Sequence, residues 1–407
     1  MKVLNFLAVL LLATPLAFGG QKKKVNYVTV KAKKKVTQVT GYNVTSAVNK
    51  FTFRCLKELV KNPNANLIFS PRLTFINLSK FYAGSKGKTR EEIQKVCGFP
   101  EDSTLLLKSL NYSDYLIKKS LESSQTTLVS NDSIWLDNDS KLKNQYKNLV
   151  SDYLPIEFFN EDFSNSEMLC NKINRWATIA THGKIRNLFS ENAVHKNTKL
   201  LSLNTLYFKG TWEFQFKRKY TKKKNFYLKP KKRKKVAMMF QKEDFSWAEN
   251  DYCKCVSLPF KNNEFSMKLI LPKKTFSIVK LLEQLTCDDF NKLEKDAKVF
   301  EVKLGMPKLN LSKLIQTKNL LGKIGLKQAF TEQADFSEMS SKNIFINRMI
   351  QKVYLKVDEA GVEAAAVSTG ELAFCTPLVF YANRPFLFFI THNKTKTILF
   401  AGYVVNP

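Results

Sequence analysis

Histidine is scarce in this chain, with three residues among 407, at His182, His195 and His392. None belongs to a His-Glu-x-x-His pattern or stands beside a cysteine cluster, so the sequence offers no recognisable metal site. It also lacks the Gly-x-Ser-x-Gly elbow of hydrolases and the Gly-x-x-x-x-Gly-Lys-Ser/Thr loop that binds nucleotides. A catalytic triad can still form from residues distant in sequence. The motifs in the sequence nevertheless argue against an enzyme, and they predict neither a bound metal ion nor a cofactor.

Long apolar runs are almost absent as well. The one near the start, residues 3–16, follows Lys2 and is shorter than the roughly 20 residues that a membrane-spanning helix needs. Ala17 and Gly19 place small residues at the two positions that signal peptidase reads. We therefore expect a signal peptide at residues 1–19, cleaved after Gly19 or Gly20, and a secreted, extracellular protein.

Seven cysteines, an odd number, leave at least one thiol outside any disulfide within a secreted chain. Seven Asn-x-Ser/Thr sequons are potential glycosylation sites of a secreted glycoprotein. Asn77 lies in an apolar stretch, so we expect its side chain to be buried. The remaining candidates are Asn43, Asn111, Asn131, Asn138, Asn310 and Asn393.

Acidic residues are outnumbered, with 35 Asp and Glu against 66 Lys and Arg, and the formal net charge is +31. Two segments contain no acidic residue. The first is residues 20–45, whose lysines and lack of acidic residues predict a mobile basic N-terminal arm. The second segment has twelve basic residues in nineteen: Lys217, Arg218, Lys219, Lys222, Lys223, Lys224, Lys229, Lys231, Lys232, Arg233, Lys234 and Lys235.

Twelve cations without a counter-charge repel one another unless a polyanion binds them. Solvated surface lysines are the plain alternative. Among polyanions, a secreted protein more often meets sulfated glycosaminoglycans or anionic membrane surfaces than nucleic acid. We therefore expect residues 217–235 to bind a sulfated glycosaminoglycan, with an anionic membrane surface as a second partner and no nucleic acid.

The hydrophobic content, 44%, suffices for a large core. Helical periodicity comes first: we expect a helix from Ser46 to just before Asn62, a second at 74–82, and a third capped by Thr89. Strand patterns dominate later, with helices at 171–179 and 276–285 between them. The expected strand segments are 127–129, 134–136, 199–208, 255–258, 265–271, 386–390 and 398–405. This order predicts an α+β architecture, and the lack of repeats or polar linkers predicts one large domain at 46–407.

The segment at 358–383 is the most informative part of the chain. If 362–368 forms a strand, Val362, Ala364 and Ala366 share a small, uncharged face with the serine that follows. Such a face can enter a sheet without burying a charge, and no proline between Gly361 and Thr376 would interrupt hydrogen bonding. Intrinsic propensity alone favours an alanine-rich helix instead.

This segment and many others resemble motifs of the serpins, in order, over essentially the whole mature chain. Glu359-x-Gly361-x-Glu363-Ala364-Ala365-Ala366 is similar to the hinge of inhibitory serpins. The other matching blocks are Asn66-Leu67-Ile68-Phe69-Ser70-Pro71, Gly84-x-x-Gly87-x-Thr89, Ile173-Asn174-x-Trp176, Thr181-x-Gly183-Lys184-Ile185, Asn204 to Trp212, Ala334-Asp335-Phe336-Ser337, Asn383-Arg384-Pro385-Phe386, and Phe400-Ala401-Gly402 to Asn406-Pro407.

The resemblance implies a single domain with helices packed on three β-sheets and an exposed reactive-centre loop. It also implies a suicide-substrate inhibitor: a serine protease cleaves the loop, and the freed hinge inserts as a new central strand. The implied hinge comprises Glu359, Gly361, Val362, Glu363, Ala364, Ala365 and Ala366.

Two positions depart from the family pattern. Val362 stands where threonine is usual, and it remains uncharged and β-branched. Gln351 stands where histidine is frequent, and because it can still donate and accept hydrogen bonds we expect altered stability with function retained.

The position of the scissile bond stays open. Counting from the hinge places Cys375 before the cut, which gives the bond Cys375-Thr376, whereas counting back from Asn383 places Phe374 there. No Lys or Arg lies between Val362 and Asn383, so a trypsin-like protease is not the obvious target. Phe374 would suit a chymotrypsin-like or cathepsin G-like enzyme.

We interpret the sequence as a secreted, heparin-binding serine protease inhibitor. In heparin-dependent serpins the polyanion bridges inhibitor and protease, so the resemblance implies that residues 217–235 are a heparin site. The basic, secreted character resembles anticoagulant serpins, including those in the saliva of blood-feeding arthropods, so a coagulation protease in hemostasis is a possible target. The alternative is a non-inhibitory serpin that acts as a glycosaminoglycan-binding or carrier protein.

Overall fold

The computed structural model describes residues 32–61, 63–181, 183, 185–190, 193–273, 277–359 and 376–407. The predicted signal peptide at 1–19 and the first part of the predicted arm lie outside these residues. Among the described residues, no helix is both long and apolar enough to cross a membrane.

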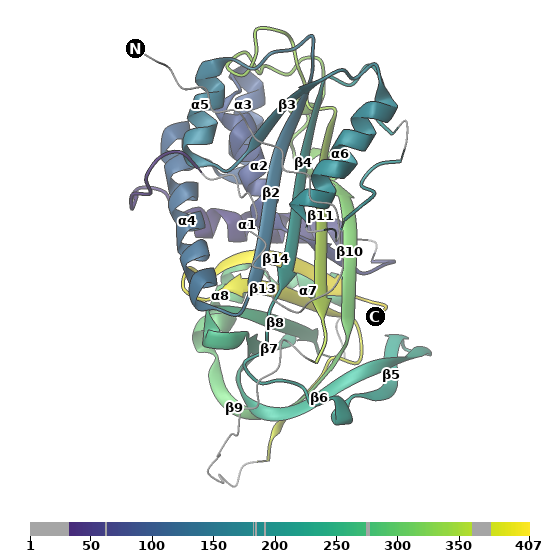
Figure 1. The fold of residues 1–407 in the computed structure, drawn as a ribbon. Coiled ribbons are helices and arrows are strands. Elements are labelled where there is room, and N and C mark those ends of the chain that lie inside the picture. The colour runs from purple at the N-terminus through teal and green to yellow at the C-terminus, as the bar shows by residue number, and fades with distance from the viewer. Residues whose placement is uncertain are drawn as a thin grey trace, which may run out of the picture.

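Most helices of the described chain lie on one face of the five-stranded sheet, whereas α6 covers the opposite face, as Figure 1 shows. Their first residues are often fixed by side chains that accept backbone N–H bonds: Asn43 before α1, Ser70 before α2 and Asp102 before α4. The bounds are α1 (Val44–Leu59), α2 (Pro71–Ala83), α3 (Gly87–Cys97), α4 (Ser103–Ser123), α5 (Asn144–Tyr153), α6 (Ser166–Ala180), α7 (Ile278–Gln284), α8 (Cys287–Asp296) and α9 (Thr317–Lys323).

Two expectations about the N-terminal part were wrong. Thr89 does not cap a helix: α3 already begins at Gly87, and the Thr89 hydroxyl accepts the backbone N–H of Asp335 at 2.9 Å. The described end of the basic arm is also held in place. The backbone N–H groups of Lys33 and Lys34 donate to carbonyls of the α5 helix, and the Lys34 ammonium lies 3.0 Å from the Asp152 carboxylate. Moreover, α1 begins within the predicted arm.

A five-stranded sheet forms the long axis of the molecule, with the order β10-β11-β4-β2-β3. β11 and β4 are parallel neighbours at its centre, whereas β10 pairs antiparallel with β11 and β2 pairs antiparallel with β4. The segments expected at 127–129 and 134–136 are the two ends of one strand. The bounds are β2 (Thr127–Asp137), β3 (Glu157–Glu161), β4 (Leu200–Lys209), β10 (Leu309–Gln316) and β11 (Arg348–Val357).

The remaining strands form one hydrogen-bonded network in place of the two further sheets that the resemblance implies. The reason is β6, which pairs with β9 over most of its length and with β7 at its last residues, and so joins both parts. The bounds are β1 (Leu67–Phe69), β5 (Lys222–Lys229), β6 (Lys232–Glu249), β7 (Cys253–Pro259), β8 (Phe265–Pro272), β9 (Lys298–Pro307), β12 (Leu378–Tyr381), β13 (Phe386–His392) and β14 (Thr397–Val404).

The core lies between the helices and the sheets, and α2 lies at its centre. Almost every residue of α2 is buried, polar ones included, because the helix packs between the other helices, β14 and the back of the five-stranded sheet. The six cysteines of the described chain are buried and form no disulfide. These observations confirm the α+β prediction and a single domain.

Candidate functional site

The ends of the segment predicted to carry the hinge and the reactive bond lie at one end of the molecule, after β11 and before β12. Glu359 and the exposed Thr376 are described. The other predicted residues lie outside the described residues: Gly361, Val362, Glu363, Ala364, Ala365, Ala366, Phe374 and Cys375. The choice between Phe374 and Cys375 therefore stays a prediction.

Glu359, the first hinge residue, is held by two side chains. Its carboxylate accepts a hydrogen bond from the Thr221 hydroxyl at 2.7 Å and lies 2.6 Å from the Lys308 ammonium. Burial opposes its charge, but these bonds outweigh the burial and keep the pKa of Glu359 below its ordinary value. Next to it, the Trp212 indole N–H donates to the Asp358 carbonyl. Sequence reasoning missed Thr221 and Lys308, because no motif marks either position.

The seam between β4 and β11 lies at the centre of the five-stranded sheet, and β11 leads into the segment predicted to carry the hinge. The two strands run parallel in register from Leu201 opposite Arg348 to Phe208 opposite Leu355. Tyr207 and Tyr354 stack across the seam with ring centroids 5.7 Å apart. Separating β4 from β11 would therefore break the backbone hydrogen bonds between the two strands and the contact between these two rings.

Gln351 ties β11 to the first turn of α2. Its side-chain oxygen accepts the Ser70 backbone N–H at 2.7 Å, and its amide nitrogen donates to the Ser70 carbonyl at 2.8 Å and the Thr74 hydroxyl at 3.1 Å. The residue is fully enclosed. The expectation that Gln351 both donates and accepts hydrogen bonds is confirmed.

On the other side of the seam, a buried polar network ties β4 to α2 and β2. The Asn204 amide nitrogen donates to the Asp132 carboxylate at 2.6 Å, and its oxygen accepts from Asn77. Asp132 also forms an ion pair with the ammonium of Lys80, whose side chain is completely buried. As expected, Asn77 is buried.

Burial of the Lys80–Asp132 ion pair costs free energy. Burial lowers the pKa of Lys80 and raises the pKa of Asp132, in spite of their mutual attraction. Both shifts disfavour the charged forms, so desolvation exceeds the Coulomb gain here. No pattern in the sequence predicted that a lysine in α2 would face into the core.

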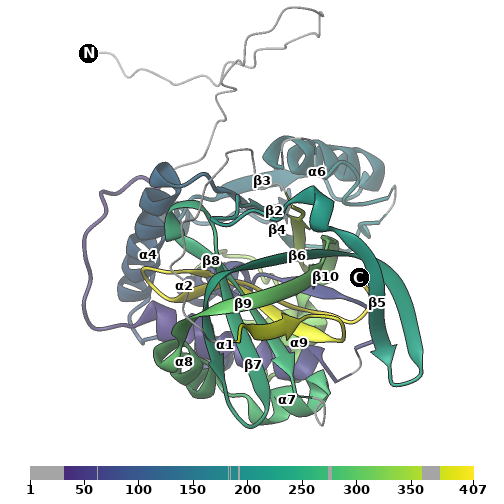
Figure 2. The same ribbon diagram turned by 90° about the horizontal axis from the view of Figure 1, so that it is seen from below.

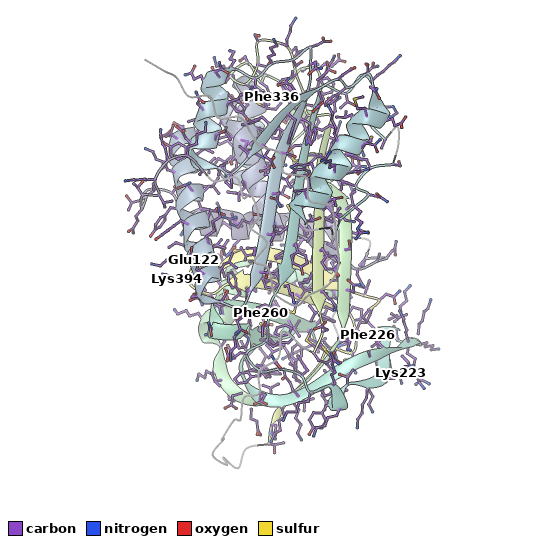
Figure 3. All side chains as sticks on the ribbon, viewed as in Figure 1. Glu122, Lys223, Phe226, Phe260, Phe336 and Lys394 are labelled. Carbon is purple, nitrogen blue, oxygen red and sulfur yellow. The ribbon has the colours of Figure 1, made fainter. Side chains whose placement is uncertain are left out.

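The basic segment at 217–235 forms a short 3₁₀ turn, η1 (Arg218–Tyr220), and a hairpin of β5 and β6 that projects from the body (Figures 1 and 2). All twelve predicted cations are exposed. Figure 3 labels Lys223 and Phe226 on β5; Phe226 is fully buried and packs with Val236 and Met238, whereas Lys223 is exposed. The hairpin therefore has an apolar patch at Phe226, Val236 and Met238, and its exposed cations lie on both of its faces.

Two contacts fasten this hairpin to the chain that follows β12. The Tyr227 backbone N–H donates to the Asn383 carbonyl at 2.7 Å, and the Lys234 ammonium donates to the Pro407 carbonyl at 2.8 Å. Within the described ranges, none of the twelve cations forms an ion pair with a carboxylate side chain. Their positive charge is thus directed to solvent.

The sequons differ in accessibility. Asn43, Asn138 and Asn310 are exposed, while Asn131 and Asn393 are half-buried with their amide nitrogens donating to backbone carbonyls. The prediction for Asn111 is corrected, because its side chain is buried and its amide nitrogen donates to the Tyr153 carbonyl at 2.7 Å. A glycan on that nitrogen could not be accommodated in this fold.

His392 has a structural role in the core. It is buried, with Nδ1 2.8 Å from the Thr395 hydroxyl and Nε2 2.9 Å from the Ser120 hydroxyl. Burial lowers the pKa of His392 to about 4, so the imidazole is neutral at physiological pH.

Comparisons with known proteins agree with the motifs. A family model described as serpin (serine protease inhibitor) matches residues 46–407. The leukocyte elastase inhibitor of Xenopus laevis is 32% identical over 377 residues, which cover 90% of this chain and 100% of that protein. Serpin B10 of Plecturocebus moloch is 32% identical over 395 residues, covering 89% of this chain and 99% of that protein.

A solved structure, the mouse protein-Z dependent protease inhibitor, superposes with a TM-score of 0.82 at 26% identity and covers 89% of this chain and 97% of that one. The matched region includes the seam, the hinge segment and the basic hairpin. The chain therefore belongs to the serpin family, which consists of protease inhibitors and related proteins and not of enzymes.

Proposed function

We propose that this chain is a secreted serpin that inhibits serine proteases as a suicide substrate and binds heparin or a related glycosaminoglycan. The observation that carries the inhibitory part is the combination of an uncharged hinge sequence with a closed seam between β4 and β11. A strand with small residues on one face can enter that seam without burying a charge.

In this proposal, the described residues control when the seam opens. Gln351 holds β11 and Asn204 holds β4 to the same helix, α2, so both strands must keep or exchange these contacts as they separate. Glu359 fixes the base of the hinge to Thr221 and Lys308 until the loop is cleaved. Cleavage would free the hinge to pair with β4 and β11 as a new strand.

The glycosaminoglycan part rests on the exposed cations of η1 and the β5–β6 hairpin. Twelve exposed cations without carboxylate partners in the described chain repel one another, and a sulfated polymer would relieve that repulsion. The hairpin that carries most of them projects from the body of the molecule (Figure 2).

The proposed target is an extracellular serine protease. The absence of Lys and Arg between Val362 and Asn383 favours a protease of chymotrypsin-like specificity that cleaves after Phe374. A coagulation protease remains the more specific candidate if a bound polyanion recruits it in spite of the loop sequence, and this would make the protein an anticoagulant.

A protease panel tests the inhibitory part. The protein is incubated with chymotrypsin-like and coagulation proteases, with and without heparin. A covalent complex that survives SDS is expected, and the mass of the released C-terminal peptide distinguishes Phe374 from Cys375. Plain loop cleavage by every protease would favour a non-inhibitory carrier protein.

Heparin chromatography tests the basic hairpin. The triple variant Lys231→Glu, Lys232→Glu, Arg233→Glu should elute at clearly lower salt than the unmodified protein, because electrostatic affinity depends on the number of contacting cations. The matched control, Lys292→Glu, Lys295→Glu, Lys298→Glu, changes the net charge equally at exposed positions around α8. Equal losses in both variants would mean that net charge, and not the hairpin, determines binding.

A further inference from the structure

A cavity of about 580 Å³ opens where η1 and the start of β5 face the middle of β6, β9 and β12. This volume lies in the range of small-ligand sites. Lysines dominate the described lining, which contains one carboxylate, Glu243. They are Lys217, Lys222, Lys224, Lys242 and Lys303. The last two lie outside the basic run at 217–235, so the fold adds them to it.

Lys242 and Lys303 stand directly opposite each other in the β6–β9 register. Like charges in this arrangement destabilise a sheet. Lys242 is partly compensated by Glu301, 2.7 Å away, while Lys303 has no ion pair among the residues that the structure describes. An anion in the cavity would therefore offset a repulsion that the fold leaves in place.

Aromatic rings form one wall of the cavity. Phe240, Gly305 and Tyr381 lie side by side on β6, β9 and β12, and the two rings meet edge to face with centroids 5.8 Å apart. A Cβ atom on Gly305 would lie 2.7 Å from the Phe240 ring and 3.0 Å from the Tyr381 ring. The glycine thus allows both rings to cover the strand, and Tyr381 stays 40% exposed.

We propose that this cavity binds a sulfated sugar unit of a glycosaminoglycan chain. The sulfates would contact the lysines, and the apolar face of the pyranose ring would lie on Tyr381 and Phe240. This inference rests on the proposed glycosaminoglycan binding, and it places one end of the bound glycosaminoglycan in this cavity.

Continuity with the hairpin favours a sugar polymer over an acidic peptide. Lys217, Lys222 and Lys224 line the cavity, and further exposed cations, Lys223 and Lys229, continue along β5, a strand about 25 Å long. A polymer with a repeating sulfated unit matches a track of that length. Because β12 begins two residues after Thr376, the bound glycosaminoglycan would also lie beside the C-terminal end of the segment predicted to carry the reactive bond.

Sucrose octasulfate, a compact sulfated disaccharide, is the probe for the cavity, with affinity measured by calorimetry. Lys303→Gln and Tyr381→Ala should each weaken its binding by about tenfold, as expected for a lost charged or stacking contact. Lys231→Gln, which removes a cation at the hairpin tip, is the matched control and should leave this affinity unchanged. Both pocket residues are solvent-exposed, so each variant should remain folded, which a cooperative thermal unfolding transition checks.

The outcomes separate the two proposals. If the unmodified protein binds heparin, but the octasulfate does not bind or binds both pocket variants normally, the cavity proposal is overturned while the hairpin proposal stands. If the unmodified protein does not bind heparin, the proposed glycosaminoglycan function itself fails. Tighter binding of a tyrosine-sulfated peptide than of the octasulfate, lost in Lys303→Gln, would assign the cavity to an acidic protein segment and overturn the sugar assignment.

Discussion

Replacing Lys80 with methionine removes the cation of the buried pair with Asp132 while keeping most of the side-chain volume. The Asp132 carboxylate then stays in the core with Asn204 as its described hydrogen-bond donor from a side chain. Breaking a buried pair by removing one partner costs about 3–5 kcal/mol. The variant should therefore be strongly destabilised.

The double variant Lys80→Met, Asp132→Asn should behave differently. An asparagine at 132 is neutral and can still accept the hydrogen bond from Asn204. Because burial shifts the pKa values of Lys80 and Asp132 away from their charged forms, removing both charges also removes the desolvation cost. The double variant should be as stable as the unmodified protein or more stable.

Thermal unfolding followed by circular dichroism measures these effects. Unfolding entropy near 2.1 cal/mol/K per residue converts the expected loss for Lys80→Met into a fall of about 4–6 °C in Tm. The loss should grow as pH rises from 5 to 8: an unpaired buried carboxyl has a raised folded-state pKa, so the folded state binds its proton more tightly than the unfolded state does.

Lys118→Met is the matched control, since its pair with Asp114 is on the surface and should contribute less than about 1 kcal/mol. A double variant that loses as much stability as Lys80→Met would refute the reasoning, because the cost would then come from altered packing and not from the unpaired charge.

Three further predictions concern other buried or surface groups. Gln351→Ala should lower Tm, because a buried Ser70 amide without its acceptor costs about 1–3 kcal/mol, whereas Gln351→His should restore much of the loss; equal Tm values for both would contradict the role of these bonds. His392 has a folded-state pKa below that of the unfolded chain, so its contribution to stability is complete above about pH 6.5 and is lost as pH falls toward about 4. His392→Gln should therefore show a smaller fall of Tm over that range than the unmodified protein, and an identical fall would refute this. After expression in secreting cells, peptide mass spectrometry should find a glycan on the exposed Asn138 and none on the buried Asn111; a glycan on Asn111 would contradict the burial.

The sequence predicted much of the fold because its signals were local. The apolar pattern at 74–82 predicted most of α2, and the apolar runs at 386–390 and 398–405 predicted β13 and β14. Thr89 was misplaced because its hydroxyl serves a contact with Asp335, far away in sequence. No local pattern encodes such a bond.

The candidate site was predictable where a motif runs along the chain and not where the fold assembles it. The cations at 217–235 are contiguous and could be found directly, and the hinge residues, also contiguous, stay a prediction. Lys303 and Tyr381 reach the cavity only through the pairing of β9 with β6 and β12, and Thr221 reaches Glu359 only through the folded hairpin. Tertiary pairing of this kind has no signature in a single sequence.

The central claim is that loop cleavage leads to strand insertion and a trapped protease. The direct measurement is a denaturing gel of the protein after incubation with chymotrypsin, with a released C-terminal peptide as the marker of cleavage. The account predicts a band at the combined mass of chymotrypsin and the cleaved chain, stable to SDS and heat. Complete cleavage without that band, and with chymotrypsin activity undiminished, would contradict it.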